Sequence, residues 1–342
     1  MRCTILPPHM LEHLADATDD RALREMARRT LVMSATQRVE RRVTTVAPAA
    51  PSEDFVPNRA VHDARHREQL PGDPVRTEGQ DSTGDETVDQ AYEWLGVTFD
   101  FFERAYRRNS IDGAGLKLVS TVHYGREYAN AFWNGRQMVY GDGDGELFLS
   151  FTGPLEVTGH ELVHGVTQHT AALEYYGQSG ALNESVSDVF GSLVKQWHLR
   201  QTADEADWII GAGLLGPDVN GVGLRSMKEP GTAYDDPRLG RDPQPGHMDD
   251  YVETYRDNGG VHINSGIPNR AFYLAAAALG GHAWEKAGRI WYDTLTGDAM
   301  KPAIEFAAFA AATIDTAGRL YGAGGAEVRA VQKAWSGVGV EP

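Results

Sequence analysis

Cysteine is nearly absent from the 342-residue chain, in which Cys3 is the single example. A disulfide within the chain is therefore excluded, together with the small protein classes that depend on such bonds. Long hydrophobic runs are also missing. The first twenty residues contain no apolar stretch of signal-peptide length, and the alanine-rich stretches 271–279 and 303–314 are too short or too interrupted for a membrane span. We therefore expect neither a standard secretory signal nor a membrane-spanning helix.

Positive charge is scarce as well. The chain has 32 Lys and Arg residues against 48 Asp and Glu residues, a formal net charge of −16, and no basic cluster interleaved with aromatic residues. Such a surface repels polyanions, so we expect no nucleic-acid partner and no membrane partner. The expected location is cytoplasmic, or outside the cell after release without a standard signal peptide.

The length favours about two domains, and 41% hydrophobic residues suffice for their cores. Residues 1–52 differ from the rest, because eight arginines and six carboxylates give them a net charge of +2 on a strongly acidic chain. A Pro- and Ala-rich linker follows at 44–57, and it is an expected cleavage site. The N-terminal unit either docks on the acidic body or is an unstructured tail. Its apolar residues have the spacing of one or two amphipathic helices: Leu11, Leu14, Leu23, Ala27 and Leu31.

The stretch 160–188 carries the strongest chemical signal. His160 and His164 are four residues apart, which places both imidazoles on one face of a helix. Glu161 points about 100° round that helix, where it can reach a metal-bound water. A second predicted helix carries Glu184, a candidate third ligand, and Asp188 one turn further on. We predict one catalytic zinc ion on His160, His164 and Glu184, with Asp188 holding a ligand histidine through its second ring nitrogen.

Three protein ligands with one open position are typical of catalytic zinc, whereas structural zinc has four protein ligands. Zinc lowers the pKa of a bound water from about 15.7 toward about 7. Glu161 can accept the water proton and return it to a leaving amine, which suits hydrolysis of peptide bonds. The alternative is a structural zinc, or an inactive peptide-binding module, and it requires a fourth protein ligand or a missing base.

The pattern before the histidines predicts a helix followed by strands. Residues 88–106 have helical spacing, with an aromatic stripe that suits core packing. Asn134-Gly135 predicts a hairpin. Strands are expected in the short apolar runs at 116–125, 130–145 and 146–151.

Helices dominate the rest of the chain. Pro154 suits the first position of a helix that runs through both histidines to His169. Residues 200–260 are irregular, and loops of this length are usually functional. Four further helices are expected at 268–280, 284–296, 301–321 and 326–335.

Taken together, these residues resemble the thermolysin-like metalloproteases, in particular the protealysin group with its short prosegment. The resemblance covers nearly the whole chain, with motifs in family order: NAFWNG, VYGDGDG, HELVH, ALNESVSDVFG, LRSM and DNGGVHINSG. It implies an α+β fold with a β-rich N-terminal catalytic domain at 53–173, which includes the HELVH helix, and a mainly helical C-terminal domain at 174–342. The zinc site would lie in the cleft between them. Residues 1–52 would be an inhibitory prosegment that is removed on maturation.

The resemblance implies a zinc-dependent neutral endopeptidase, made as a zymogen, that acts on peptide or protein substrates. Tyr175 and His262 would donate hydrogen bonds to the developing oxyanion. Asp257, five residues before His262, would orient its imidazole. A small protein inhibitor is a further expected partner.

Substrate-binding residues are also implied. Asn130 and Ala131 would bind the substrate backbone at a strand edge, and Arg225 would bind a carbonyl oxygen. A hydrophobic residue just after the cleaved bond would be preferred, because four residues would line an apolar pocket for it, although core packing is the alternative for each: Phe148, Phe151, Val157 and Leu224.

The sequence departs from the family at a pair of calcium ions that lie behind the active site. Glu156 and Asp207 are still acidic, but Lys195, Ile209 and Ala212 stand at matching positions and are not. Each calcium needs six to eight oxygen ligands. We therefore expect at most one weak calcium site, with the Lys195 ammonium where a cation would sit.

Cys3 and the residues after it suggest how the prosegment inhibits. Ile5, Leu6, Pro7 and Pro8 form a polyproline-prone segment that can lie across the cleft as a substrate would. The Cys3 thiolate would then be a candidate ligand for the open zinc position. The alternative is that Cys3 is a free thiol.

Two other classes of zinc peptidase share the His-Glu-x-x-His motif. One has a third histidine six residues after the second one, and here Thr170 occupies that position. Zinc aminopeptidases need paired carboxylates for an N-terminal amine, and none is assigned here. An endopeptidase is therefore favoured.

Overall fold

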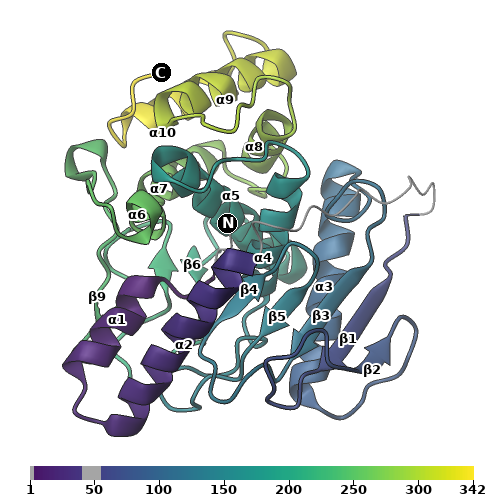
Figure 1. Cartoon of the computed structure of the whole chain (residues 1–342). Coiled ribbons are helices and arrows are strands. Elements are labelled where there is room, and N and C mark those ends of the chain that lie inside the picture. The colour runs from purple at the N-terminus through teal and green to yellow at the C-terminus, as the bar shows by residue number, and fades with distance from the viewer. Residues whose placement is uncertain (1–3, 41–54) are drawn as a thin grey trace.

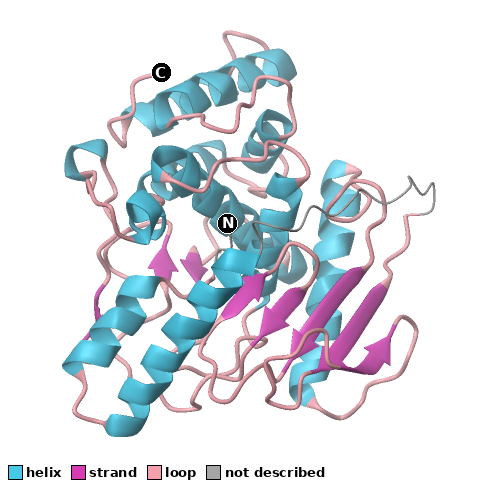
Figure 2. Ribbon diagram, in the orientation of Figure 1, coloured by secondary structure: helices cyan, strands magenta, loops and turns pink. Residues whose placement is uncertain are grey.

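A five-stranded mixed sheet forms the centre of the N-terminal half (Figures 1 and 2). The computed structural model describes residues 4–40 and 55–342, with the backbone alone over 36–40. The strand order is β2-β1-β3-β5-β4, in which β1 pairs antiparallel with β2, β3 pairs parallel with β1 and β5, and β4 pairs antiparallel with β5. β4 is therefore an edge strand, and one of its sides is not paired with another strand of the sheet. The strands are β1 (Arg59–Asp63), β2 (Asp73–Thr77), β3 (Leu118–Val122), β4 (Ala131–Trp133) and β5 (Met138–Tyr140).

One predicted helix covers this sheet. α3 (Glu86–Tyr106) confirms the helix expected at 88–106, and it begins two residues earlier because Asp85 caps it by accepting hydrogen bonds from two backbone N–H groups. The aromatic stripe of α3 packs against β1 and β3 and against the central helices. Core packing is thus the correct interpretation of the stripe.

The hairpin prediction at Asn134-Gly135 is confirmed, because β4 and β5 flank this turn and Gly135 has a φ of +92°. The strand expected at 146–151 is wrong. Asp144 accepts hydrogen bonds from the backbone N–H groups of Leu147 and Phe148, which curls the segment into a loop with one isolated bridge to Leu215. A carboxylate that captures backbone donors in this way competes with strand pairing.

Two helices, α4 (Leu155–Gln168) and α5 (Gly177–Leu199), form the centre of the molecule. α4 packs against β4, β5 and α3 on one side and against α5 on the other. The two helices approach closely at glycine: a Cβ added to Gly191 would stand 2.7 Å from the Glu156 carbonyl oxygen. Pro154 precedes α4 with extended backbone angles, so its expected place as the first helical residue is wrong.

The C-terminal half is mainly helical (Figure 2). The four predicted helices are confirmed, although the third begins at Phe306 rather than at residue 301, because residues 301–305 form a turn before it. The irregular segment before them forms small ladders, β6 (Ile209–Ile210) with β7 (Arg225–Ser226) and β8 (Asp235–Asp236) with β9 (Gly240–Arg241). The later helices are α6 (Asp257–Asn264), α7 (Gly266–Leu279), α8 (Ala287–Leu295), α9 (Phe306–Tyr321) and α10 (Ala326–Ser336). Among the described residues, no helix is both long and apolar enough to cross a bilayer.

The N-terminal unit docks on the rest of the molecule rather than forming an unstructured tail, over the residues that the structure describes. It consists of α1 (Pro8–Ala17) and α2 (Arg21–Glu40), drawn in purple in Figure 1. Their apolar faces belong to the same buried cluster as the core of the catalytic halves. α1 contacts β9, and α2 reaches the segment before β4, so the unit spans both halves.

Candidate metal centre and cleft

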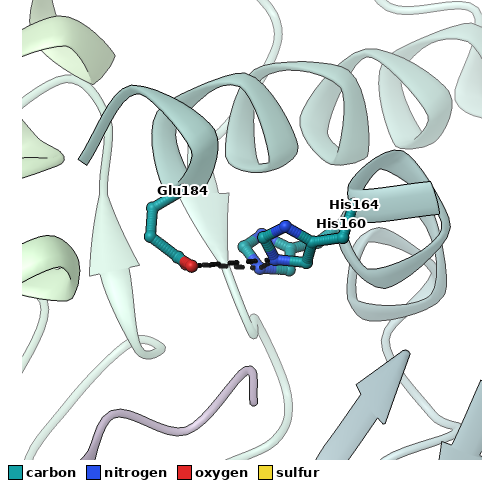
Figure 3. Close-up of side chains that lie close together, drawn as sticks. All are labelled: His160, His164 and Glu184. Atoms are coloured by element: carbon teal, nitrogen blue, oxygen red, sulfur yellow. Dashed lines mark hydrogen bonds and ion pairs between the residues drawn. The ribbon is translucent and has the colours of Figure 1, made fainter. Parts of the chain in front are cut away.

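Two imidazoles and one carboxylate converge between α4 and α5 (Figure 3). His160 and His164 project from one face of α4, and Glu184 faces them from α5. Ligand atoms of the three side chains all lie within 4.8 Å of one another, and all three residues are buried. The carboxylate oxygens of Glu184 are 3.6 Å from His160 Nε2 and 3.7 Å from His164 Nε2.

The other ring nitrogen of each histidine is held by α5. His160 Nδ1 lies 2.8 Å from Asp188 Oδ1, and His164 Nδ1 lies 2.7 Å from Asn183 Oδ1. A carboxylate and an amide oxygen can only accept, so both Nδ1 atoms carry the proton. In this tautomer the Nε2 of each ring offers its lone pair to a metal ion.

This donor set fits zinc. Two imidazole nitrogens on one tetrahedral zinc stand roughly 3.4 Å apart, given Zn–N bonds of about 2.1 Å, and here the two Nε2 atoms are 3.1 Å apart. Two bare imidazole nitrogens and a carboxylate, buried together, would repel one another without a cation between them. His160, His164 and Glu184 are therefore consistent with a catalytic zinc site of three protein ligands.

Glu161 follows the first histidine and lies fully buried beside the site. Its Oε2 accepts a hydrogen bond of 2.8 Å from the backbone N–H of Trp133 in β4. That hydrogen bond joins the Glu161 carboxylate to the outer edge of β4, the edge that lines the cleft. Glu161 is thus oriented from the sheet, not only from its own helix.

Tyr175, His262 and Asp257 form a connected group on the far side of Glu184. The Tyr175 hydroxyl donates to Glu184 Oε1 and lies 3.4 Å from His262 Nε2. His262 Nδ1 lies 2.7 Å from Asp257 Oδ1. Burial alone would lower the pKa of His262, but the negative charges of Asp257 and Glu184 raise it above the ordinary value. The sequence expected a loop here, and the structure has a short helix, α6, interrupted by left-handed angles from Asn258 to Gly260.

Asp188 has more partners than the sequence indicated. Besides His160, it accepts two hydrogen bonds of 2.8 Å from the Arg225 guanidinium and one of 2.9 Å from Asn269. Burial opposes ionisation of Asp188, but Arg225 and His160 outweigh it and hold the pKa of this carboxyl well below its usual range. Arg225, expected only to bind a substrate carbonyl, thus also contacts the carboxylate behind a zinc ligand.

The N-terminal unit occupies the cleft with residues 5 and 6. The Ile5 N–H donates to the Ala131 carbonyl oxygen at 3.1 Å, and Arg225 donates to the Ile5 carbonyl oxygen at 3.0 Å. Leu6 donates to Asn130 Oδ1 at 2.9 Å and accepts from Asn130 Nδ2 at 3.2 Å. The three residues expected to bind the substrate backbone therefore all bind the backbone of this unit.

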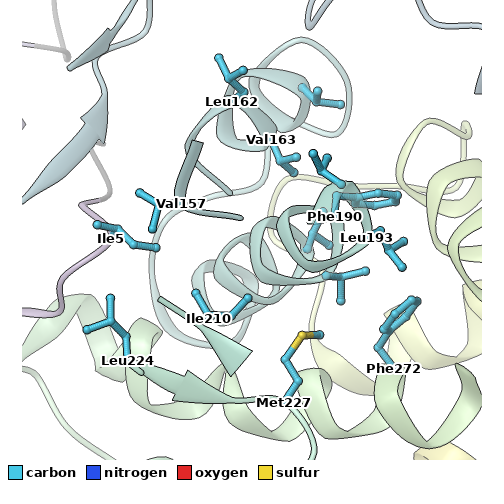
Figure 4. Packing of buried hydrophobic residues seen from close by; sticks show 14 of the residues in the cluster. Ile5, Val157, Leu162, Val163, Phe190, Leu193, Ile210, Leu224, Met227 and Phe272 are labelled. Carbon is cyan, nitrogen blue, oxygen red and sulfur yellow. The ribbon is translucent and has the colours of Figure 1, made fainter. Parts of the chain in front are cut away.

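The Ile5 side chain is fully buried in an apolar pocket (Figure 4). Val157 and Leu224 lie on either side of it, and Ile210 lies nearby. Phe148 and Phe151 belong to the same buried cluster, with ring centroids 6.3 Å apart. Cys3 lies outside the described residues.

Lys195 lies in the region where calcium was considered. Its Nζ is 2.9 Å from Asp207 Oδ2, 3.4 Å from Glu156 Oε1 and 3.3 Å from the Ile209 carbonyl oxygen. Ala212 donates its N–H to Glu156 as well. Burial raises the pKa of Glu156 despite the nearby ammonium. The Lys195 ammonium is thus the cation that contacts the oxygen atoms of Glu156, Asp207 and Ile209.

Two family descriptions match consecutive parts of the chain, from residue 50 to residue 340. The thermolysin metallopeptidase catalytic domain matches residues 50–168, and the thermolysin metallopeptidase alpha-helical domain matches residues 171–340. An extracellular metalloprotease from Pectobacterium carotovorum is 54% identical over 99% of this chain and 96% of its own length. The chain belongs to the thermolysin family of metallopeptidases.

A solved relative of this thermolysin family is the precursor of protealysin from Serratia proteamaculans. It superposes with a TM-score of 0.91, at 54% identity, over 99% of both chains. The thermostable neutral protease NprT from Geobacillus stearothermophilus is 41% identical over 82% of this chain and 50% of its own length. The present protein is accordingly a zinc metalloendopeptidase of the thermolysin family, made as a precursor with a prosegment, and it has the two-domain α+β fold expected from its motifs.

Three contacts of this thermolysin-family site were missed at the level of sequence. They are the acceptor role of Asn183, the support of Glu161 by the Trp133 backbone, and the pairing of Arg225 with Asp188. Asn183 adjoins the ligand Glu184, so its position beside the metal was available from the sequence. The oxygen that it offers to His164 depends on how closely α4 and α5 pack, which no local spacing indicates.

Proposed function

We propose that Glu161 is the general base of peptide hydrolysis and that Tyr175 and His262 stabilise the oxyanion. Zinc on the three ligands would supply a water of lowered pKa and would polarise the substrate carbonyl. Glu161 would accept the water proton and deliver it to the leaving amine. The Tyr175 hydroxyl and the His262 Nε2–H would donate to the developing negative charge. Asp257 favours the doubly protonated ring that this donation requires, because it accepts from Nδ1.

The observation that best supports a peptide-cleaving cleft is the binding of Ile5 and Leu6 by Ala131, Asn130 and Arg225. These contacts engage backbone N–H and C=O groups, which every peptide carries. Ile5 stands in for the residue just after the cleaved bond, since it fills the pocket that the family resemblance assigns to that residue. A hydrophobic residue at this position of a substrate is therefore proposed to be preferred.

Removal of zinc and neutralisation of Glu161 test the proposed chemistry. A chelator should abolish cleavage of a blocked internal peptide by the processed protein, and added zinc should restore it. Glu161→Gln should lower kcat by a factor of about 10² or more, the range for a lost general acid or base. Its zinc content should be unchanged, because Glu161 is not a ligand. Glu86→Gln, at an exposed position of α3, is the matched control. Full activity of Glu161→Gln would refute the role of this residue.

The proposed specificity is tested with peptides that differ only in the residue after the cleaved bond. Burial of a Leu side chain contributes about 1.5–3 kcal/mol relative to exposure, so Leu should exceed Ala at this position by about ten-fold or more in kcat/KM. Asp should be cleaved poorly, because the labelled side chains around Ile5 in Figure 4, Val157, Leu224 and Ile210, are apolar. Equal rates for Leu and Asp would exclude an apolar pocket.

We also propose that residues 1–52 inhibit the enzyme until they are cut off, leaving domains at 53–173 and 174–342. Cys3 stands two residues before Ile5 in the sequence, so its thiolate is the candidate ligand for the open zinc position of the uncut protein. X-ray absorption at the zinc edge tests this idea. A sulfur ligand that disappears in Cys3→Ser supports ligation, and an unchanged zinc environment shows a free thiol.

Calcium and location complete the proposal. At most one weak calcium is proposed, since Lys195 already contacts Glu156 and Asp207. Two relatives are named as extracellular, which supports release from the cell over a cytoplasmic location. Protease activity in culture medium, measured against a cytoplasmic marker, tests this. A small protein inhibitor that binds the mature cleft is a further proposed partner, by family resemblance.

A further inference from the structure

The backbone between Tyr128 and Ala131 offers more hydrogen-bonding groups to the cleft than the proposed substrate contacts use. The carbonyl oxygens of Tyr128 and Asn130 accept from Gly143 and Gly141, on the inner side of the segment. Successive residues of an extended chain point to opposite sides. Ala129 and Ala131 therefore both face outward, and both contact the prosegment: Ala131 through its carbonyl oxygen and Ala129 through its N–H.

The direction of the bound segment follows from its contacts. Ile5 pairs with Ala131, and Leu6, the next residue, pairs with Asn130, the preceding residue of the protein. The two chains are therefore antiparallel. A peptide that continues along this edge places its next residue, the third after the cleaved bond, opposite Ala129.

The prosegment itself leaves the edge at this point. Its chain bends at residues 5 and 6, α1 begins at Pro8, and the Pro7 carbonyl oxygen accepts the N–H of Met10 inside the new helix. The Ala129 N–H instead donates to the hydroxyl of Thr30, from α2, at 3.3 Å. A buried backbone donor needs an acceptor. A side chain from a second helix thus replaces the carbonyl that a continuous peptide would provide.

The surface beside Ala129 is covered by the same helix. Ser34 of α2 lies 3.0 Å from the Tyr128 hydroxyl, and Met33 fills an apolar recess formed by Tyr124, Tyr128 and Phe132. These α2 contacts and the Thr30 contact are lost together when the prosegment leaves. Ala129 is then open to a substrate.

We infer that, in the processed enzyme, the Ala129 N–H donates to the backbone carbonyl of the third substrate residue after the cleaved bond. In the uncut protein the Thr30 hydroxyl of the prosegment accepts this hydrogen bond instead. The inference rests on the proposed function, because it uses Ile5 as the residue just after the cleaved bond. The ligand is an unfolded polypeptide of any sequence with at least three residues beyond that bond. One net hydrogen bond of this kind changes kcat/KM by about two- to ten-fold.

Matched peptides test the inference on the processed enzyme. Two blocked substrates are compared, and both have Leu and Ala as the first two residues after the cleaved bond. The shorter substrate ends there as an amide. The longer one has a third residue, glycine, before the terminal amide, which adds backbone without a side chain. Addition of the glycine should raise kcat/KM by about two- to ten-fold. In a four-residue series, a thioamide at the third carbonyl, a weaker acceptor, should lower kcat/KM, whereas a thioamide at the fourth carbonyl should not.

Variants of Ala129 provide the second test. Ala129→Pro removes the N–H and should reduce the three-residue peptide to the rate of the two-residue peptide. Ala129→Gly keeps the N–H and should retain the difference. If the proline variant does not fold, the thioamide comparison still shows whether the third carbonyl accepts a hydrogen bond from the enzyme. Equal effects of the third and fourth thioamides would overturn the inference. Failure of the proposed function has a separate signature, which is loss of the hydrophobic preference in the two-residue peptides.

Discussion

His9 is a titratable residue of the prosegment that lies close enough to Asp257 and His262 for their charges to affect its pKa. Its Nε2 is 3.0 Å from the Tyr234 hydroxyl, and its Nδ1 is shielded from solvent without a hydrogen-bond partner among the described residues. Burial lowers the pKa of His9 to about 4, against the attraction of Asp257, and the positive charge of Arg225 and the nearby His262 add to the lowering. A cavity beside it is lined by Glu12, His13, Asp16, Arg256 and Asp257. Docking of the prosegment therefore keeps this imidazole neutral.

The first prediction concerns pH. Because the detached His9 has the ordinary pKa of about 6.5 and the docked one a pKa of about 4, protons favour the detached state. Docking should be strongest above pH 6.5 and should weaken as the pH falls from 6.5 to 4. The measurement is the fraction of prosegment that stays with the catalytic domains in gel filtration after the linker is cut.

Two variants isolate this effect from other titrations. His9→Gln should flatten the loss of prosegment between pH 6.5 and 4. His13→Gln, on the exposed face of the same helix, should leave it unchanged. An undiminished pH dependence in His9→Gln would show that another group is responsible.

At the scale of single elements, α5 carries both Glu184, a metal ligand, and Lys195, whose ammonium is proposed to stand where a calcium ion would sit. Lys195 of α5 bridges Glu156 of α4 and Asp207 of the following loop. Lys195→Met keeps an unbranched apolar side chain but removes the ammonium and leaves Glu156 buried without it. The free energy of unfolding should fall by about 1–3 kcal/mol, less than the roughly 3–5 kcal/mol of a fully buried pair, because Asp207 is half exposed. Urea unfolding of the zinc-loaded protein measures this.

Calcium titration is the companion experiment. Calcium should not change the unfolding midpoint of the natural protein, whereas Lys195→Asp, which restores an acidic ligand, should be stabilised by calcium. Lys228→Met removes an exposed ammonium and should match the natural protein. Two tight calcium sites near Glu156 in the natural protein would contradict the proposal.

At the scale of the whole molecule, the prosegment joins the two catalytic halves. Ile5 contacts Ala131 of the N-terminal half and Arg225 of the C-terminal half. α1 contacts β9 in the C-terminal half, and α2 contacts the segment before β4 in the N-terminal half. Ile5→Asp would bury a carboxylate in the apolar pocket, which should weaken docking by about 100-fold or more. The uncut variant should therefore cleave a short blocked peptide, whereas the uncut natural protein should not.

Activity of the uncut Ile5→Asp variant is measured at early time points, when a gel shows that the chain is still intact. This separates it from activity that arises after the prosegment is cut off. Ala22→Asp introduces the same group on the exposed face of α2 and should leave inhibition intact. Full activity of the uncut natural protein would exclude inhibition by the prosegment.

Local spacing made much of the site predictable. His160 and His164 share a helix face in any α-helix, and the glycine turn at Asn134-Gly135 specifies its hairpin regardless of the surroundings. The strand expected at 146–151 failed because Asp144 offered a competing local partner, which apolar periodicity does not register.

The sequence by itself determined the zinc-binding residue types, the helices that carry them and the family, because these depend on spacing along one chain. Tertiary structure alone decided that Asn183 faces His164, that Lys195 lies between Glu156 and Asp207, and that Thr30 reaches Ala129. Each of these contacts joins segments that meet only when the helices and the sheet pack. Their geometry depends on close approach, as at Gly191 between α4 and α5, and therefore on the whole fold.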